Sequence, residues 1–139
     1  MTITKEFDFM CIGSGPAGQR AAVQVAKLGL RVGVIEKQRV VGGSCVISGT
    51  IPSKTFREAV LALRPVTRGS ERQEYRLAAP PTMGELLDKV GDLVDLESRI
   101  VENQLSRNNV SLIRGEACFK DSHTIAVQSD GKTLHFRAH

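Results

Sequence analysis

The sequence of 139 residues is poor in aromatic residues, and its basic residues form no continuous patch. Tryptophan is absent, tyrosine occurs once, and aromatic residues make up 4% of the chain. The formal net charge is +4, but the lysines and arginines are scattered. Proteins that bind single-stranded nucleic acid usually combine a basic groove with aromatic side chains that stack on bases. The composition therefore argues against nucleic acid as a partner.

Cysteines and long apolar runs are also scarce. Cys11, Cys45 and Cys118 are too few for a disulfide framework. No apolar run approaches the roughly 18–20 residues of a membrane helix, and residues 1–6 lack the apolar core of a secretion signal. We therefore expect a cytoplasmic protein that makes no contact with a membrane. The three histidines lack metal-ligand spacing, so we predict no metal site.

The sequence does contain a glycine-rich turn close to its start. Residues 7–12 form a short apolar run typical of a buried strand. Gly13, Gly15 and Gly18 follow at G-x-G-x-x-G spacing. In such a turn the glycines permit a tight bend, a close approach of the backbone to a pyrophosphate, and the packing of a helix on the strand. Pro16 suits the first turn of that helix.

A second strand and an acidic residue complete this unit. Small apolar residues recur at helical spacing up to Leu28, and Gly29 ends the helix. Residues 31–35 form another apolar strand, followed at once by Glu36, whose carboxylate can accept hydrogen bonds from ribose hydroxyls. The alternative is a glycine turn without a ligand. Strand, turn, helix, strand and acid together predict a dinucleotide site, without indicating which dinucleotide.

The rest of the chain predicts an α/β domain. The expected elements are a glycine-rich irregular stretch at 38–50, a helix at 53–64, a loop at 65–81, a long helix from Thr82 (with Glu85 as a capping box) to about 107, a strand at 110–114, and three short strands at 117–120, 124–127 and 133–137. Residues 7–12, 31–35 and 110–114 are expected to form a parallel sheet, beside a three-stranded antiparallel meander. Cys11 and Cys118 lie in apolar strand patterns, and packing is their expected role. The open edge of so small a sheet is a liability in a free-standing domain, so we expect a truncated chain.

Residues 42–54 read Gly-Gly-Ser-Cys-Val-Ile-Ser-Gly-Thr-Ile-Pro-Ser-Lys. Together with the glycine turn and Glu36, this stretch resembles the flavoprotein disulfide reductase superfamily, the class I pyridine nucleotide-disulfide oxidoreductases, whose fingerprint here is G-G-x-C-x-x-x-x-C-x-P-S-K. Cys45 matches the first redox cysteine, whereas Thr50 occupies the second position. Thiol–disulfide exchange needs both sulfurs, so a dithiol relay at this pair is excluded. The run from Cys45 to Lys54 is similar to one branch, the soluble pyridine nucleotide transhydrogenases.

The resemblance covers the whole chain and implies a Rossmann-like FAD-binding domain, present as the N-terminal third of a family member. It implies a βαβ unit with a glycine-rich flavin loop at 1–50, a helical part at 51–109, and a strand with a β-meander at 110–139. The nicotinamide and dimerisation domains of the family are not in this sequence. For a full-length member, the resemblance implies a homo-oligomer.

The resemblance also implies which residues hold FAD. The residues so implied are Gly13, Ser14, Gly15, Pro16 and Ala17 at the pyrophosphate, Glu36 at the adenosine ribose with Lys37 beside it, Gly43, Ser44 and Cys45 along the ribityl chain and flavin, Lys54 near the flavin, and Gly115 and Ala117 at the adenine. Lys54 as a surface lysine and Cys45 as a plain small buried residue are the alternatives. No residue is assigned a certain catalytic step.

The implied reaction is hydride transfer between NADPH and NAD⁺ through flavin, with both nicotinamide nucleotides as substrates. Two alternatives stay open. One is a flavoprotein like dihydrolipoamide dehydrogenase that has lost its second redox cysteine. The other is a nucleotide-binding module without catalysis, and we expect the 139-residue chain alone to be inactive.

Overall fold

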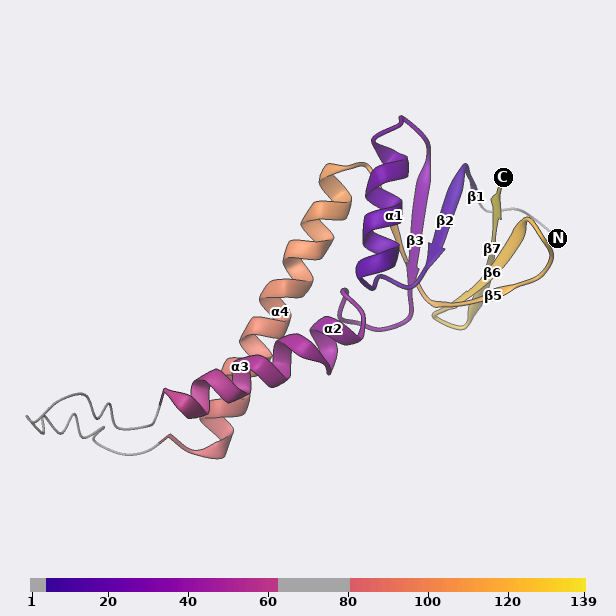
Figure 1. The fold of residues 1–139 in the computed structure, drawn as a ribbon. Coiled ribbons are helices and arrows are strands. Elements are labelled where there is room, and N and C mark those ends of the chain that lie inside the picture. Colours follow the sequence, from indigo (N-terminus) through magenta and orange to yellow (C-terminus); the bar gives the residue numbers. More distant parts are fainter. Residues whose placement is uncertain (1–4, 63–80) are drawn as a thin grey trace, which may run out of the picture.

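The computed structural model describes residues 5–62 and 81–139, which form two sheets, with the helices on one side of the first sheet and the second sheet on its other side (Figure 1). In chain order the elements are β1 (Lys5–Phe7), β2 (Phe9–Ile12), α1 (Pro16–Ala26), β3 (Val32–Glu36), α2 (Ser44–Ile47), α3 (Thr50–Leu61), α4 (Met83–Arg107), β4 (Ser111–Arg114), β5 (Glu116–Phe119), β6 (Thr124–Ser129) and β7 (Lys132–Ala138). The loop predicted at 65–81 lies, except for its last residue, outside the described residues.

The predicted parallel sheet is confirmed, with β3 between β2 and β4. Val34 is the central residue, opposite Cys11 on β2 and Leu112 on β4. All five residues of β3 are buried, as expected for a central parallel strand. The first apolar core joins this sheet to α1 and α4; its buried members are Ala22, Val23, Val32, Val34, Val41, Val101, Leu105 and Val110.

The second sheet has one strand more than predicted, in the order β1-β7-β6-β5. The prediction of a single strand over 7–12 is wrong, because the chain changes sheet at Asp8. The Asp8 carboxylate accepts a hydrogen bond of 2.7 Å from the Arg31 backbone N–H. Phe7 is 1% exposed and its ring lies 6.1 Å from that of Phe136. Burial of Phe7 thus places β1 beside β7, where the two strands run parallel.

One predicted helix begins earlier than expected, and one short helix was not predicted. Helix α3 begins at Thr50 instead of residue 53, and the stretch predicted as irregular contains the short helix α2, whose Val46 is buried. The capping box of α4 is confirmed: the Glu85 N–H donates to Thr82 Oγ1 at 3.2 Å, and the Thr82 N–H donates to the Glu85 carboxylate at 2.7 Å. Figure 1 shows α3 and the first part of α4 extending away from the sheets.

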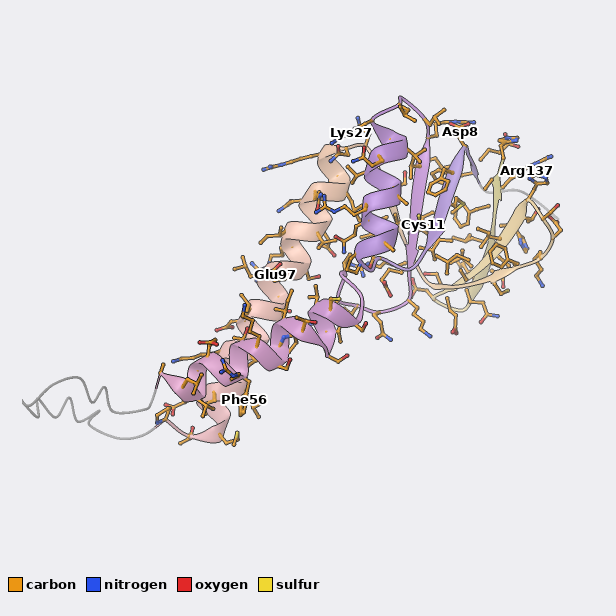
Figure 2. The ribbon with its side chains drawn as sticks, viewed as in Figure 1. Asp8, Cys11, Lys27, Phe56, Glu97 and Arg137 are labelled. Atoms are coloured by element: carbon orange, nitrogen blue, oxygen red, sulfur yellow. The ribbon has the colours of Figure 1, made fainter. Side chains whose placement is uncertain are left out.

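Cys11 and Cys118, the two cysteines that lie on strands, differ in their burial. Cys11 lies beneath α1 (Figure 2) and packs against the first core, where burial raises the pKa of its thiol. Packing as the role of Cys118 is wrong, because its side chain is exposed. Successive residues of a strand face opposite sides. On β5, Ala117 packs against a second apolar core, whose buried members are Phe7, Ile35, Ile125, Val127 and Phe136. In the described parts of the chain, no helix is long and apolar enough to cross a membrane.

Candidate functional site

The glycine turn after β2 packs closely against β3 and α1, and its other side is open. The Gly13 N–H donates to the Ile35 carbonyl at 2.7 Å, and Gly13 has a φ of +98° that favours glycine. A Cβ at Gly18 would lie 2.3 Å from the Gly13 carbonyl oxygen, so Gly18 permits α1 to pack on the turn. A Cβ at Gly13 or Gly15 would meet nothing within 4 Å. The first two glycines therefore border open space that a ligand could fill.

The N-terminus of α1 faces this space and is free of side-chain partners. Gly15 is the N-cap, no side chain caps the helix, and its first turn holds Pro16 and Ala17 but no acidic residue. The first N–H groups of a helix lack intrahelical acceptors, and the helix dipole places partial positive charge there. The arrangement fits an anion such as a pyrophosphate.

Ser14 and Glu36 form a buried pair beside the turn. Their exposed fractions are 0% and 6%. Glu36 Oε2 accepts hydrogen bonds from the Ser14 N–H at 2.9 Å and from Ser14 Oγ at 2.5 Å, and Oε1 accepts one from the Gln38 N–H at 2.8 Å. Burial is the largest single influence and raises the pKa of Glu36, but the hydrogen bonds from Ser14, Gln38 and Lys37 together bring the pKa below its ordinary value. Glu36 is therefore a fixed, ionised acceptor at neutral pH.

The loop from Val41 to Gly43 rests against the turn. The Gly42 N–H donates to Ser14 Oγ at 3.0 Å. Gly43 has a φ of +68°, and a Cβ on it would lie 2.7 Å from the Gly15 Cα. The structure thus brings the predicted pyrophosphate turn, the predicted ribose acid and the predicted flavin loop into one connected group.

The segment after this loop carries the remaining predicted flavin residues. Ser44 is exposed and Cys45 half-buried on α2, and Thr50 is exposed at the start of α3. A tight turn joins the two helices, since the Gly49 N–H donates to the Ser44 carbonyl at 2.6 Å. Lys54 is exposed on α3 and makes no hydrogen bond or ion pair within residues 5–62 and 81–139. The structure does not join Lys54 to the turn.

A cavity of about 490 Å³ lies beside the residues that directly follow Glu36. Its lining residues directly follow β3 or lie in or next to β4, β5 and β6: Lys37, Gln38, Arg114, Gly115, Glu116, Gln128, Ser129 and Asp130. The exposed Lys37 ammonium and Glu116 carboxylate lie 3.5 Å apart. The Gly115 N–H donates to the Glu36 carbonyl at 3.0 Å. Lys37, predicted beside the ribose acid, and Gly115, predicted at the adenine, line the cavity. Ala117, the other residue predicted at the adenine, packs against the second core.

Gly115 is also required by internal packing. Its φ is +145°, and a Cβ there would lie 2.5 Å from the Gln128 carbonyl oxygen. The backbone at this glycine thus contacts β6 closely, where the meander meets the end of the parallel sheet.

Sequence reasoning missed several residues that shape the site. Ser98 on α4 accepts a hydrogen bond from the Val41 N–H at 2.9 Å, and Gln19 Nε2 donates to the Ser14 carbonyl at 2.7 Å. Arg114 donates to the carbonyls of Gln38 and Arg39 and pairs with the Glu102 carboxylate. A signal for Ser98 existed: its hydroxyl falls within the apolar stripe of the long helix, where a buried polar group requires a partner.

Comparison with known proteins places these features in a family. The family described as pyridine nucleotide-disulphide oxidoreductase matches residues 7–138. The chain is 45% identical over 129 residues to a soluble pyridine nucleotide transhydrogenase of Mycobacterium bovis, covering 92% of this chain and 28% of that protein. It is 37% identical over 139 residues to the soluble pyridine nucleotide transhydrogenase of Vibrio atlanticus, covering 99% and 30%. The chain thus spans less than a third of the length of these relatives.

A solved structure shows the same fold. The HOCl-induced flavoprotein disulfide reductase RclA from Escherichia coli, in its Cu(II) complex, superposes with a TM-score of 0.76 at 24% identity, covering 99% of this chain and 27% of that chain. The match includes the parallel sheet, the flanking helices and the meander that surround the turn. Because the family match extends over nearly all of the sequence, the chain belongs to the pyridine nucleotide-disulphide oxidoreductase family.

Proposed function

We propose that the chain binds FAD, with the ADP half on the glycine turn and the flavin half along Gly43, Ser44 and Cys45. The observation that carries this proposal is the double hydrogen bonding of the Ser14 hydroxyl, which joins Glu36 to the Gly42 amide. We expect a ligand that contacts both ends of this network to place a ribose close to Glu36 and a further portion along the Val41–Gly43 loop. FAD has this shape, whereas a mononucleotide would use only one end.

The proposed roles follow from position and charge. The uncapped N-terminus of α1, with Gly13, Ser14, Gly15, Pro16 and Ala17, would hold the pyrophosphate. Glu36 would accept hydrogen bonds from the adenosine ribose. The cavity lined by Lys37 and Gly115 would receive the adenine, with the backbone near Ala117 at its margin.

For the whole protein we propose hydride exchange between NADPH and NAD⁺ without a redox disulfide. Bound flavin would supply the capacity to accept a hydride from one nicotinamide and donate it to another. The chain would hold and orient that cofactor, and the Lys54 ammonium would favour negative charge near it. Thr50 supports this reading, because Cys45 has no sulfur partner five residues later. The names of the relatives support it as well.

Retention of flavin tests the binding proposal directly. The 139-residue chain is mixed with excess FAD and desalted, and the flavin absorption of the protein fraction is recorded. We expect retained flavin that excess ADP displaces and riboflavin does not, because the ADP half carries the buried contacts. Ser106→Ala, an exposed change on α4, is the control and should retain the same amount. A protein fraction without flavin would overturn the proposal.

A cysteine variant of the full-length protein tests the reaction. The unaltered protein should oxidise NADPH with an NAD⁺ analogue and should not reduce lipoamide. Thr50→Cys restores the spacing of a redox pair with Cys45 and should introduce lipoamide reduction. Lipoamide reduction by the unaltered protein would instead favour a dihydrolipoamide-dehydrogenase-like enzyme.

A further inference from the structure

We propose that Ser98, in the middle of α4, is a positioning residue for the flavin half of the site. This inference rests on the proposed FAD site and adds a residue that lies 57 positions from the loop it holds. Ser98 is expected to touch no ligand. It acts through the backbone of the Val41–Gly43 loop.

The first support is the way in which two consecutive amides of this loop are held. The Val41 N–H donates to Ser98 Oγ at 2.9 Å, and the Gly42 N–H donates to Ser14 Oγ at 3.0 Å. The loop lies outside the helices and strands, so its amides have no ladder partner. Two hydroxyls, one on the glycine turn and one on α4, therefore fix the loop backbone.

The second support is burial. Ser98 is 8% exposed and Val41 is 0% exposed. A buried N–H that loses its acceptor costs more free energy than an exposed one, because water cannot replace the bond. The Val41 side chain sits in the first core, so the residue cannot turn its amide toward solvent without leaving that core. Ser98 thus specifies where the loop runs.

The third support is the position of the residues that come at the end of the loop and directly after it. Gly43, one residue after the held pair, lies so close to Gly15 that a Cβ would meet the Gly15 Cα at 2.7 Å. Ser44 and Cys45, the residues proposed beside the flavin, follow directly. A shift of the loop would move these residues, whereas the hydrogen bonds between Ser14 and Glu36 do not involve Ser98.

The test compares ligands that use different halves of the site. Ser98→Ala removes the acceptor, Ser98→Thr keeps a hydroxyl, and Ser106→Ala on the same helix is the exposed control. We expect Ser98→Ala to weaken FAD binding about tenfold and ADP binding less than about twofold, because one buried hydrogen bond of the loop is lost. Ser98→Thr should recover most of the FAD affinity, and Ser106→Ala should change neither affinity. Hydrogen exchange of the Val41 amide, measured without ligand, should accelerate about tenfold in Ser98→Ala.

The outcomes separate positioning from general stability. Equal losses of FAD and ADP affinity in Ser98→Ala would overturn the proposal, since the residue would then support the fold as a whole. Unchanged FAD affinity with faster exchange at Val41 would also overturn it. If the unaltered chain binds ADP but not FAD, the proposed function fails, and the exchange rate at Val41 still shows whether Ser98 holds the loop.

Discussion

Two regions of the candidate site differ in how much of their geometry the chain itself fixes. In the turn region, Gly13–Gly18 with Glu36, the two polar side chains Ser14 and Glu36 are buried and bonded to each other. In the helical region, Ser44–Lys54, Ser44, Thr50 and Lys54 are exposed, and α3 has no buried residue. The turn region is preorganised for a ligand, whereas the exposed side chains of Ser44, Thr50 and Lys54 are not held in place by burial within the described residues.

The largest expected effect separates two glycines of the turn region. Gly18→Ala places a Cβ 2.3 Å from the Gly13 carbonyl oxygen, so α1 must move away from the turn. We expect the free energy of unfolding to fall by roughly 3 kcal/mol, as in other overpacked contacts. Chemical denaturation measures this loss.

Gly15→Ala is the matched variant in the same turn. Its φ of −65° is accessible to alanine, and the added Cβ meets nothing within 4 Å. Stability should be preserved, while FAD affinity falls because the methyl group occupies the space proposed for the pyrophosphate. Equal stability loss in both variants would show that the space above Gly15 is not open.

The next effect concerns the buried carboxylate. Glu36→Gln keeps the size of the side chain but gives it a donor where Ser14 and Gln38 also donate. We expect a loss of roughly 1–3 kcal/mol in the free energy of unfolding, the cost of a buried hydrogen-bonding group left unsatisfied. FAD affinity should fall as well. Unchanged denaturation would contradict the preorganisation of the turn region.

The pH dependence of stability sharpens this test. Hydrogen bonds hold the pKa of Glu36 below its ordinary value of 4.5 in the folded chain. A lowered pKa contributes stability above the unfolded value, and this contribution is lost as pH falls through the folded pKa. The stability difference between the unaltered chain and Glu36→Gln should therefore shrink below about pH 4.

Comparing the unaltered chain with Glu36→Gln also cancels the contribution of other carboxylates to the pH dependence of stability. Asp8 and Asp121 have lowered pKa values too, through hydrogen bonds from Arg31 and His123, but they are present in both proteins. Urea denaturation at several pH values gives the two curves. A constant difference across the acid range would mean that the network around Glu36 does not depend on its charge.

The same contrast explains what the sequence could predict. The turn, β3 and Glu36 are adjacent in sequence, and their spacing reflects backbone requirements that glycines and apolar runs display directly. Strand β1 was missed because its three residues are stabilised by β7 at the opposite end of the chain. Ser98 was missed for the same reason, since its partner Val41 lies on a loop that only the tertiary fold brings to α4.

The face of a strand on which a side chain lies was also not predictable from the local sequence pattern. Cys11 and Cys118 have similar apolar neighbours in sequence, yet Cys11 faces the core under α1 while Cys118 is exposed on β5. A strand of an antiparallel sheet that packs on one side buries one of its two faces. Register with the next strand decides which residues take that face. Here Ala117, opposite Val127, takes the inner position.

The smallest expected effect lies in the helical region. Lys54 is exposed and forms no bond within the described residues, so Lys54→Met should leave the free energy of unfolding unchanged. If its ammonium lies near bound flavin, its removal should disfavour the negative charge of the reduced form and lower the midpoint potential by roughly 20 mV. Lys37→Met, an exposed lysine on the adenine side, is the control and should leave the potential unchanged. An unchanged potential in both variants would make Lys54 a surface residue and would leave Gly43, Ser44 and Cys45 as the flavin-side residues of the described chain.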